Sequence, residues 1–145
     1  MTTYSYVLGK VVALILFCHI YIMCEHGTSR ETVSKYCVEV RKLGLRIEEL
    51  ISESLGLDRD CLRKVLGDQG QHMAINYYPP CPEPDMTFGL PGHTDPNTLT
   101  VLLQDWHVSG LQVLKDGKWL TNKPLLHAFV INIGDQLQVI CNGNF

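Results

Sequence analysis

The sequence lacks the close cysteine spacing of a zinc site or a disulfide scaffold. No two of its six cysteines form a C-x-x-C pair, although such sites and frameworks usually show short, regular spacings. The cysteines are scattered at Cys18, Cys24, Cys37, Cys61, Cys81 and Cys141. We therefore expect reduced thiols, which are typical of cytoplasmic proteins.

A run of basic residues is also missing. The net charge is −3 and no segment is rich in Lys or Arg, so composition gives no reason to expect a nucleic-acid partner. The hydrophobic fraction of 46% and the charged fraction of 19% are those of a globular protein. A chain of 145 residues has the size of one domain and can bury an adequate core.

No apolar run reaches the length of a clear membrane span. Val11–Cys24 is apolar except for His19, but it is shorter than the ~20 residues that a spanning helix needs. Lys10 could flank a signal peptide, yet no small-x-small cleavage site follows. We treat residues 1–27 as an atypical apolar segment that carries no chemistry, with a weak membrane anchor as the alternative.

Residues 28–70 have the pattern of helices. Thr28 and Glu31 have the spacing of a capping box, which favours a helix start. Apolar residues then recur at intervals of three and four, as on the buried face of a helix. They are Val33, Tyr36, Cys37, Val40, Leu43, Ile47, Leu50 and Ile51. A second, short helix is predicted from Asp58 to Leu66 and is ended by Gly67.

From residue 71 the pattern changes to short β-rich segments separated by Pro, Gly and Asn. Predicted strands are Met73–Tyr78, Leu90–Asp95, Thr98–Gln104, Leu111–Lys115, Lys118–Leu120, Phe129–Ile133 and Gln136–Ile140. Asp116-Gly117 is a hairpin signal. We expect Leu99, Val101 and Leu103 to share a buried face, and Trp119 to pack rather than bind a ligand. Many short strands with turn signals indicate an antiparallel sandwich or barrel.

One short motif contains two residue types that bind divalent metals. In an extended strand His93 and Asp95 point to the same face, because side chains alternate. An imidazole and a carboxylate supply two corners of the 2-His-1-carboxylate triad that binds Fe(II) and leaves positions open for O2. Taken alone, H-x-D is common, and a surface His beside a turn Asp is the simpler interpretation.

Longer motifs around this pair change that interpretation. The chain reads NYYPPCPEP from Asn76, GLPGHTDPNTLTVLLQD from Gly89, GLQVLKDGKW from Gly110 and FVINIGDQLQ from Phe129. This order resembles the plant 2-oxoglutarate- and Fe(II)-dependent dioxygenases, in particular flavanone 3-hydroxylase-like, flavonol synthase-like and salicylate hydroxylase-like enzymes. The resemblance runs from about residue 28 to 145. It does not cover residues 1–27, for which a replaced start of the chain is our preferred interpretation.

The resemblance implies an α+β fold in which N-terminal helices (residues 28–70) pack on a cupin-like double-stranded β-helix, or jelly roll (residues 71–145). It implies Fe(II) as metal, 2-oxoglutarate as cosubstrate and ascorbate as reductant. His93 and Asp95 match the iron ligands, and Asn76 and Tyr78 match the positions that bind 2-oxoglutarate. For Asn76 and Tyr78, local packing and turn contacts are the simpler alternative. Phe88 and Leu90 are candidate substrate contacts, chosen only because they are near His93.

The resemblance also implies an incomplete site. In the family a third iron ligand, a His followed by Arg, would fall about five residues beyond Phe145, and the Arg and Ser that bind the far carboxylate of 2-oxoglutarate come later. The jelly roll is therefore expected to be truncated. None of the other histidines has the setting of a replacement ligand; they are His19, His26, His72, His107 and His127.

Three hypotheses about function follow. The first is an oxygenase, in plant specialised metabolism such as flavonoid biosynthesis, that hydroxylates or desaturates a small aromatic such as a flavonoid or phenolic acid with O2. The second is a non-catalytic remnant or interaction fragment of such an enzyme. The third is a small membrane-anchored protein, resting only on Val11–Cys24. For the oxygenase we expect a cytoplasmic monomer without a membrane or nucleic-acid partner.

Overall fold

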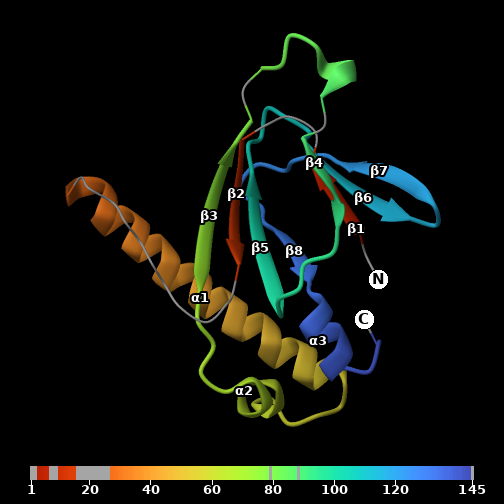
Figure 1. Cartoon of the computed structure of the whole chain (residues 1–145). Coiled ribbons are helices and arrows are strands. Elements are labelled where there is room, and N and C mark those ends of the chain that lie inside the picture. The colour runs from red at the N-terminus through yellow and green to blue at the C-terminus, as the bar shows by residue number, and fades with distance from the viewer. Residues whose placement is uncertain (1–2, 7–9, 16–26, 79, 88, 145) are drawn as a thin grey trace. The chain divides into compact units, whose positions relative to one another are not determined.

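The computed structural model describes residues 3–6, 10–15, 27–78, 80–87 and 89–144. The chain divides into two compact units. One comprises Met1–Ala13 with Ala74–Phe145, and the other comprises Leu14–Met73. The first unit is mainly strands and the second is mainly helices (Figure 1).

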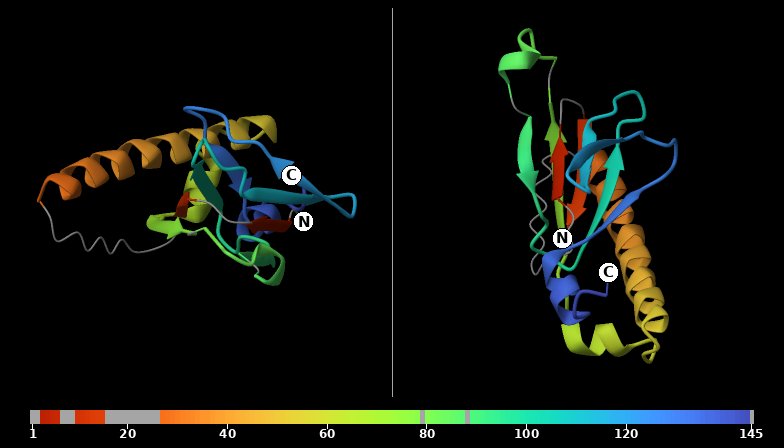
Figure 2. Two further views of the ribbon diagram at one scale, coloured as in Figure 1. Left: turned by 90° about the horizontal axis from the view of Figure 1, so that it is seen from above. Right: turned by 90° about the vertical axis from the view of Figure 1, so that its right-hand side faces the viewer.

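The strands form two four-stranded sheets (Figures 1 and 2). One sheet has the order β4 (Leu90–His93), β1 (Thr3–Tyr6), β6 (Leu111–Lys115) and β7 (Lys118–Asn122). The other has the order β3 (His72–Tyr77), β2 (Lys10–Ile15), β5 (Leu99–Gln104) and β8 (Val130–Ile133). β1 pairs antiparallel with β4 and β6, β6 with β7, and β5 with β8. A one-turn helix, η1 (Pro84–Met86), lies between β3 and β4.

The N-terminal residues differ from the sequence-based expectation. β1 lies between β4 and β6, and β2 lies between β3 and β5, so part of the apolar segment belongs to the sheets. A short run rich in β-branched and apolar residues suits a buried strand as well as a membrane segment, and the pattern alone does not separate the two. Residues 16–26 lie outside the described part of the chain. No helix among the described residues is long and apolar enough to cross a membrane.

The core of the first unit lies around β5 and β6. Leu102 and Leu111 are fully buried, and Tyr78, Leu90, Val113 and Val130 pack against them. β5 is buried on both faces, since Leu99, Thr100 and Val101 are buried as well. The expectation of one buried face ending at Leu103 is therefore wrong: Leu103 is only half-buried.

β6 and β7 form the predicted hairpin. Lys115 pairs with Lys118, and the turn residues Asp116 and Gly117 have φ of 51° and 73°, as a two-residue hairpin loop requires. Every residue of β7 before its last is exposed. Trp119 is 44% exposed, so it is not the packing residue that we expected. An exposed ribbon gives its indole little apolar surface to cover.

The last predicted strand is a helix. Residues Asp135–Ile140 form α3, with the Gln138 amide donating to the Gly134 carbonyl. Leu137 and Cys141 are buried, and their spacing of four residues is that of one helix face. The Gln-Leu-Gln-Val alternation suggested a strand because five residues are too few to separate a period of 2 from one of 3.6.

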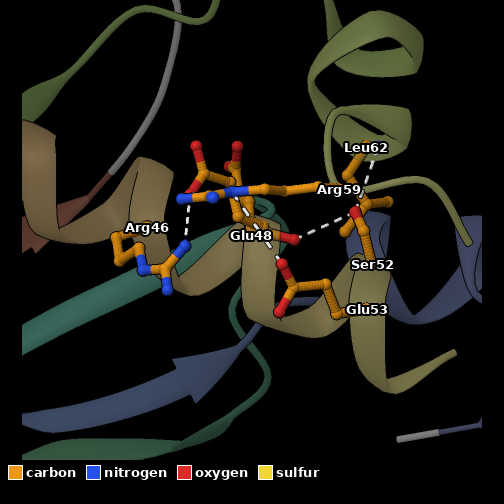
Figure 3. A network of polar contacts seen from close by, with 7 residues as sticks. Arg46, Glu48, Ser52, Glu53, Arg59 and Leu62 are labelled. Carbon is orange, nitrogen blue, oxygen red and sulfur yellow. Dashed lines mark hydrogen bonds and ion pairs between the residues drawn. The ribbon is translucent and has the colours of Figure 1, made fainter.

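The helical unit contains α1 (Gly27–Ser54) and α2 (Cys61–Leu66), as the sequence predicted to within a few residues. The Ser52 hydroxyl donates to the Glu48 carbonyl (3.0 Å) and accepts from the Leu62 amide (3.3 Å), which ties the two helices together (Figure 3). Arg59 reaches back to the Glu49 carboxylate at 2.7 Å. These contacts fix the loop between the helices.

A buried carboxylate distinguishes α1. Glu48 is 1% exposed. Its Oε2 accepts a hydrogen bond from Gln69 at 2.9 Å, and its Oε1 has no hydrogen-bond partner among the described residues. Burial raises the pKa of Glu48, although the Gln69 hydrogen bond and the charge of Arg41 act in the opposite direction. A raised pKa means that the folded state holds the proton more tightly than the unfolded state. Protonated Glu48 therefore contributes to stability at low pH, and this contribution is lost as pH rises through the folded pKa.

The free energy of unfolding of Glu48→Gln, measured relative to that of the unmodified chain, is expected to increase when the pH is raised from 4 to 7. Since the amide cannot ionise, the gain should be about 1–3 kcal/mol, the usual effect of an unsatisfied buried polar group. Urea unfolding of both proteins at both pH values measures it. Glu39→Gln is the control, because Glu39 lies exposed on the same helix. An equal pH response in the two variants would contradict the prediction.

Candidate metal centre

His93 and Asp95 are positioned where an edge strand ends. His93 is the last residue of β4, at the edge of its sheet, and pairs in register with Tyr4 of β1. Pro96 follows Asp95 and helps to keep the residue before it extended. The chain then enters β5 at Leu99. This local sequence holds the two side chains at the start of a tight β4–β5 connection.

The two side chains face each other. His93 Nε2 and Asp95 Oδ1 lie 3.5 Å apart, and the side chains are 36% and 12% exposed. Metal–nitrogen and metal–oxygen bonds in protein sites are about 2.0–2.2 Å, so one ion can bond to both atoms at this separation. The predicted pair is therefore brought together in a geometry that fits a divalent cation.

A backbone carbonyl determines which ring nitrogen of His93 carries the proton. His93 Nδ1 lies 2.9 Å from the Pro91 carbonyl oxygen. A carbonyl only accepts, so Nδ1 carries the proton and donates it, and in the neutral ring Nε2 presents its lone pair toward Asp95. Ligating histidines commonly use the other ring nitrogen in this way, because it fixes the tautomer and the ring orientation.

A third ligand is not found in the part of the chain that the structure describes, where no three His, Cys, Asp or Glu side chains cluster as a metal site. The Asp105 carboxylate lies 3.1 Å from His107 Nδ1, but its Oδ1 also accepts from the His107 amide at 2.9 Å, so this pair is a turn contact. His127 is exposed in a loop, and His72 begins β3. His19 and His26 lie outside the described residues.

Asn76 and Tyr78 come from the other sheet. Asn76 lies in β3 and Tyr78 directly follows it. Both are half-buried, and Tyr78 packs on the Leu102–Leu111 core. Burial raises the pKa of the Tyr78 phenol, so its hydroxyl remains a neutral donor at physiological pH. A neutral hydroxyl and an amide are suitable partners for a carboxylate.

Of the two candidate substrate contacts, only Leu90 lies in the described part of the chain. Phe88 lies outside the described residues. Leu90 is half-buried against the Leu102–Leu111 core. A separate cavity of about 280 Å³ is lined by Gln104, Asn122, Lys123, Leu125, Ala128, Phe129 and Val130, and none of the predicted site residues belongs to it.

The sequence analysis missed the polar residues behind Asp95. Asn132 donates to Asp95 Oδ2 at 3.3 Å, and Thr94 donates to the Asp135 carboxylate at 2.8 Å. Asn132 and Asp135 belong to the FVINIGDQLQ motif that the chain shares with the resembled family. The motif contains polar residues inside a strand-like apolar run, and that was the available signal.

Comparison with known proteins supports the same family. The model of the 2OG-Fe(II) oxygenase superfamily matches residues 69–145. Over 114 residues the chain is 68% identical to Protein DOWNY MILDEW RESISTANCE 6 of Arabidopsis thaliana, covering 79% of this chain and 33% of that protein. Over 116 residues it is 60% identical to Flavanone 3-dioxygenase 2 of Oryza sativa subsp. japonica, covering 80% and 34%. The chain thus spans about a third of the length of these curated relatives.

A solved structure shows the same fold. The crystal structure of JOX2 in complex with 2OG, Fe and JA matches with a TM-score of 0.80 and 34% identity, covering 98% of this chain and 47% of that one. This likeness confirms the predicted fold class of helices with a cupin-like jelly roll.

Proposed function

Because the chain belongs to the 2OG-Fe(II) oxygenase superfamily, we propose that His93 and Asp95 are two of its Fe(II) ligands and that Asn76 and Tyr78 hold 2-oxoglutarate. The convergence of His93 Nε2 and Asp95 Oδ1 at 3.5 Å carries this proposal. When bound, iron and 2-oxoglutarate would supply the oxidising power. O2 would be consumed, 2-oxoglutarate would be converted to succinate and CO2, and the substrate would be hydroxylated or desaturated.

The protein's own residues position and shield these groups. The Pro91 carbonyl holds the His93 ring with Nε2 directed at the site, and Asp95 is buried except for 9% of its surface. The hydrogen bond from the Asn132 side-chain nitrogen to Asp95 Oδ2 at 3.3 Å restricts the direction of this carboxylate. Tyr78 and Asn76 would hold the cosubstrate by neutral hydrogen bonds.

We propose a small aromatic, such as a flavonoid or a phenolic acid, as the substrate. The support is the likeness to the rice flavanone 3-dioxygenase. We also propose the cytoplasm as the location. The support is that the thiols of Cys61, Cys81 and Cys141, among the described residues, form no disulfide, as in a reducing compartment.

A second candidate function is a non-catalytic fragment that associates with a relative. The observation that favours it is the absence of a third metal ligand among the described residues. The two functions differ in metal chemistry, because a non-catalytic fragment needs no preserved His93–Asp95 site.

We expect Fe(II) to bind this chain far more weakly than a full-length relative, because the loss of even an outer-shell partner typically lowers metal affinity ~10–100-fold. The remaining binding should disappear in His93→Ala and in Asp95→Ala. Anaerobic titration with Fe(II) alone measures both effects. Asp105→Ala is the matched control, since Asp105 and His107 form a His–Asp contact at the same spacing in an exposed turn.

Two outcomes would change the proposal. Binding as tight as in a full-length relative, and dependent on His93, would mean that the chain has a third ligand. Binding that is lost equally in Asp105→Ala and Asp95→Ala would remove the case for this centre.

A further inference from the structure

Asp95 is held at two points by one turn of the chain. Its backbone carbonyl accepts a hydrogen bond from the Asp135 amide at 2.7 Å, and its Oδ2 accepts from the Asn132 side-chain nitrogen at 3.3 Å. Asn132 is 1% exposed. The metal-facing residue is thus attached to the segment from β8 to α3, 37 residues further along the chain.

That segment is itself fixed. Thr100 of β5 pairs with Asn132 of β8, and beyond the ladder the Gly134 amide donates to the Thr98 carbonyl at 3.0 Å. The Gln136 amide donates to the Asn97 carbonyl at 3.2 Å. Asn132 therefore sits on a strand whose register leaves its side chain little freedom.

The two carboxylate oxygens of Asp95 have different neighbours. Oδ2 meets Asn132, whereas Oδ1 lies 3.5 Å from His93 Nε2. An ionised carboxylate only accepts hydrogen bonds, so the amide nitrogen of Asn132, not its oxygen, must face it. The hydrogen bond engages one oxygen and leaves the other directed at the metal position.

We propose that Asn132 is a positioning residue that makes Asp95 a single-oxygen ligand through Oδ1. This inference rests on the proposed function, since it assumes that Asp95 binds the metal. A carboxylate that is not held can rotate and bind an ion through both oxygens, which would occupy a coordination position otherwise available to another ligand. Partners of this kind typically change metal affinity ~10–100-fold when they are removed.

The competing explanation is purely structural: a buried amide needs an acceptor, and Asp95 supplies one. Asn97 provides a matched comparison. It is also a fully buried asparagine, but its side-chain nitrogen donates to the Thr100 hydroxyl at 2.9 Å. Its removal disturbs the same β4–β5 connection without taking a hydrogen bond from the Asp95 carboxylate.

The test is a titration with Co(II) alone, which binds N/O sites like Fe(II) and somewhat more tightly, followed by visible absorption up to saturation. The proteins are the unmodified chain and its Asn132→Ala, Asn132→Leu, Asn97→Ala and Asp95→Ala variants. Asn132→Leu keeps nearly the volume of the side chain without the donor, in case Asn132→Ala fails to fold. Circular dichroism and urea unfolding establish that each protein is folded.

We expect both Asn132 variants to weaken Co(II) binding ~10–100-fold and to change the absorption spectrum at saturation, because the coordination number of the metal changes. Asn97→Ala should lose stability but keep the affinity and spectrum of the unmodified chain. A folded Asn132 variant with unchanged affinity and spectrum would overturn the inference about Asn132 but not the proposed function. Co(II) binding that Asp95→Ala does not reduce would overturn the proposed function instead.

Discussion

The 145-residue polypeptide is expected to release no CO2 from 2-oxoglutarate above the background of free iron, with or without a flavonoid or salicylate. The described residues offer the two proposed metal ligands, His93 and Asp95, and no cluster of three His, Cys, Asp or Glu side chains that could hold an ion. An ion held by two side chains is poorly oriented, and a misplacement of ~1 Å can lower a rate ~100-fold. Asn76 and Tyr78 are neutral, so they cannot replace a charge-assisted contact from arginine to the far carboxylate of 2-oxoglutarate.

Extension of the chain should restore turnover. The extension would carry the His-Arg and Arg-x-Ser positions of the resembled family, which supply the third ligand and the arginine. We expect CO2 release to rise at least ~100-fold over the unextended chain and to disappear again in the extended Asp95→Ala variant. Release of ¹⁴CO2 from labelled 2-oxoglutarate measures this for the chain, the extended chain and the Asp95→Ala version of each.

One result would contradict this prediction directly. Release by the unextended chain that is lost in Asp95→Ala would show that these 145 residues already form a working site. An extended chain that releases no CO2 but still binds Fe(II) through His93 would argue instead for the non-catalytic function.

Gly134→Ala is expected to have the largest effect on stability. A Cβ at this position would overlap the backbone carbonyl and the side-chain oxygen of Asn97. The two segments would have to separate, which breaks the bonds from Gly134 to Thr98 and from Asp135 to Asp95. We expect a loss above ~4 kcal/mol, a size that few single substitutions reach, or a failure to fold.

The backbone angles make the interpretation of Gly134→Ala simple. Gly134 has φ of −85° and ψ of 167°, which alanine adopts freely, so only the contact with Asn97 forbids the side chain. Gly117→Ala is the control. Its φ is +73°, but no atom of the described residues lies within 4 Å of where the added Cβ would be. The control should lose only about 1–2 kcal/mol, the cost of a left-handed residue. Urea unfolding compares them, and equal losses would show that the β4–β5 connection moves aside easily.

Local chemistry made several elements predictable. The period of three and four residues indicated α1, and Asp116-Gly117 indicated the β6–β7 hairpin. Likewise, an H-x-D pair on extended chain was expected to converge, and His93 and Asp95 do face each other. Each of these depends on residues close in sequence, so the local pattern contained the necessary information.

The N-terminal strands and α3 depended on distant partners. An apolar run such as Lys10–Ile15 can be a strand or part of a membrane segment, and its place between β3 and β5 depends on residues more than fifty positions away. The alternation of residues 136–140 suggested a strand. The turn at Gly134, which is held by Asn97 and Thr98, directs the chain into a helix instead.

The sequence by itself determined the family and the jelly-roll class, because these follow from motif order. It also predicted the two metal ligands that we propose, because their side-chain chemistry suits a divalent cation. Only the tertiary structure decided that Asn132 holds one oxygen of Asp95 while the other faces His93. Hydrogen bonds between segments 37 residues apart depend on strand register, and register is fixed by packing of the whole sheet rather than by any local pattern.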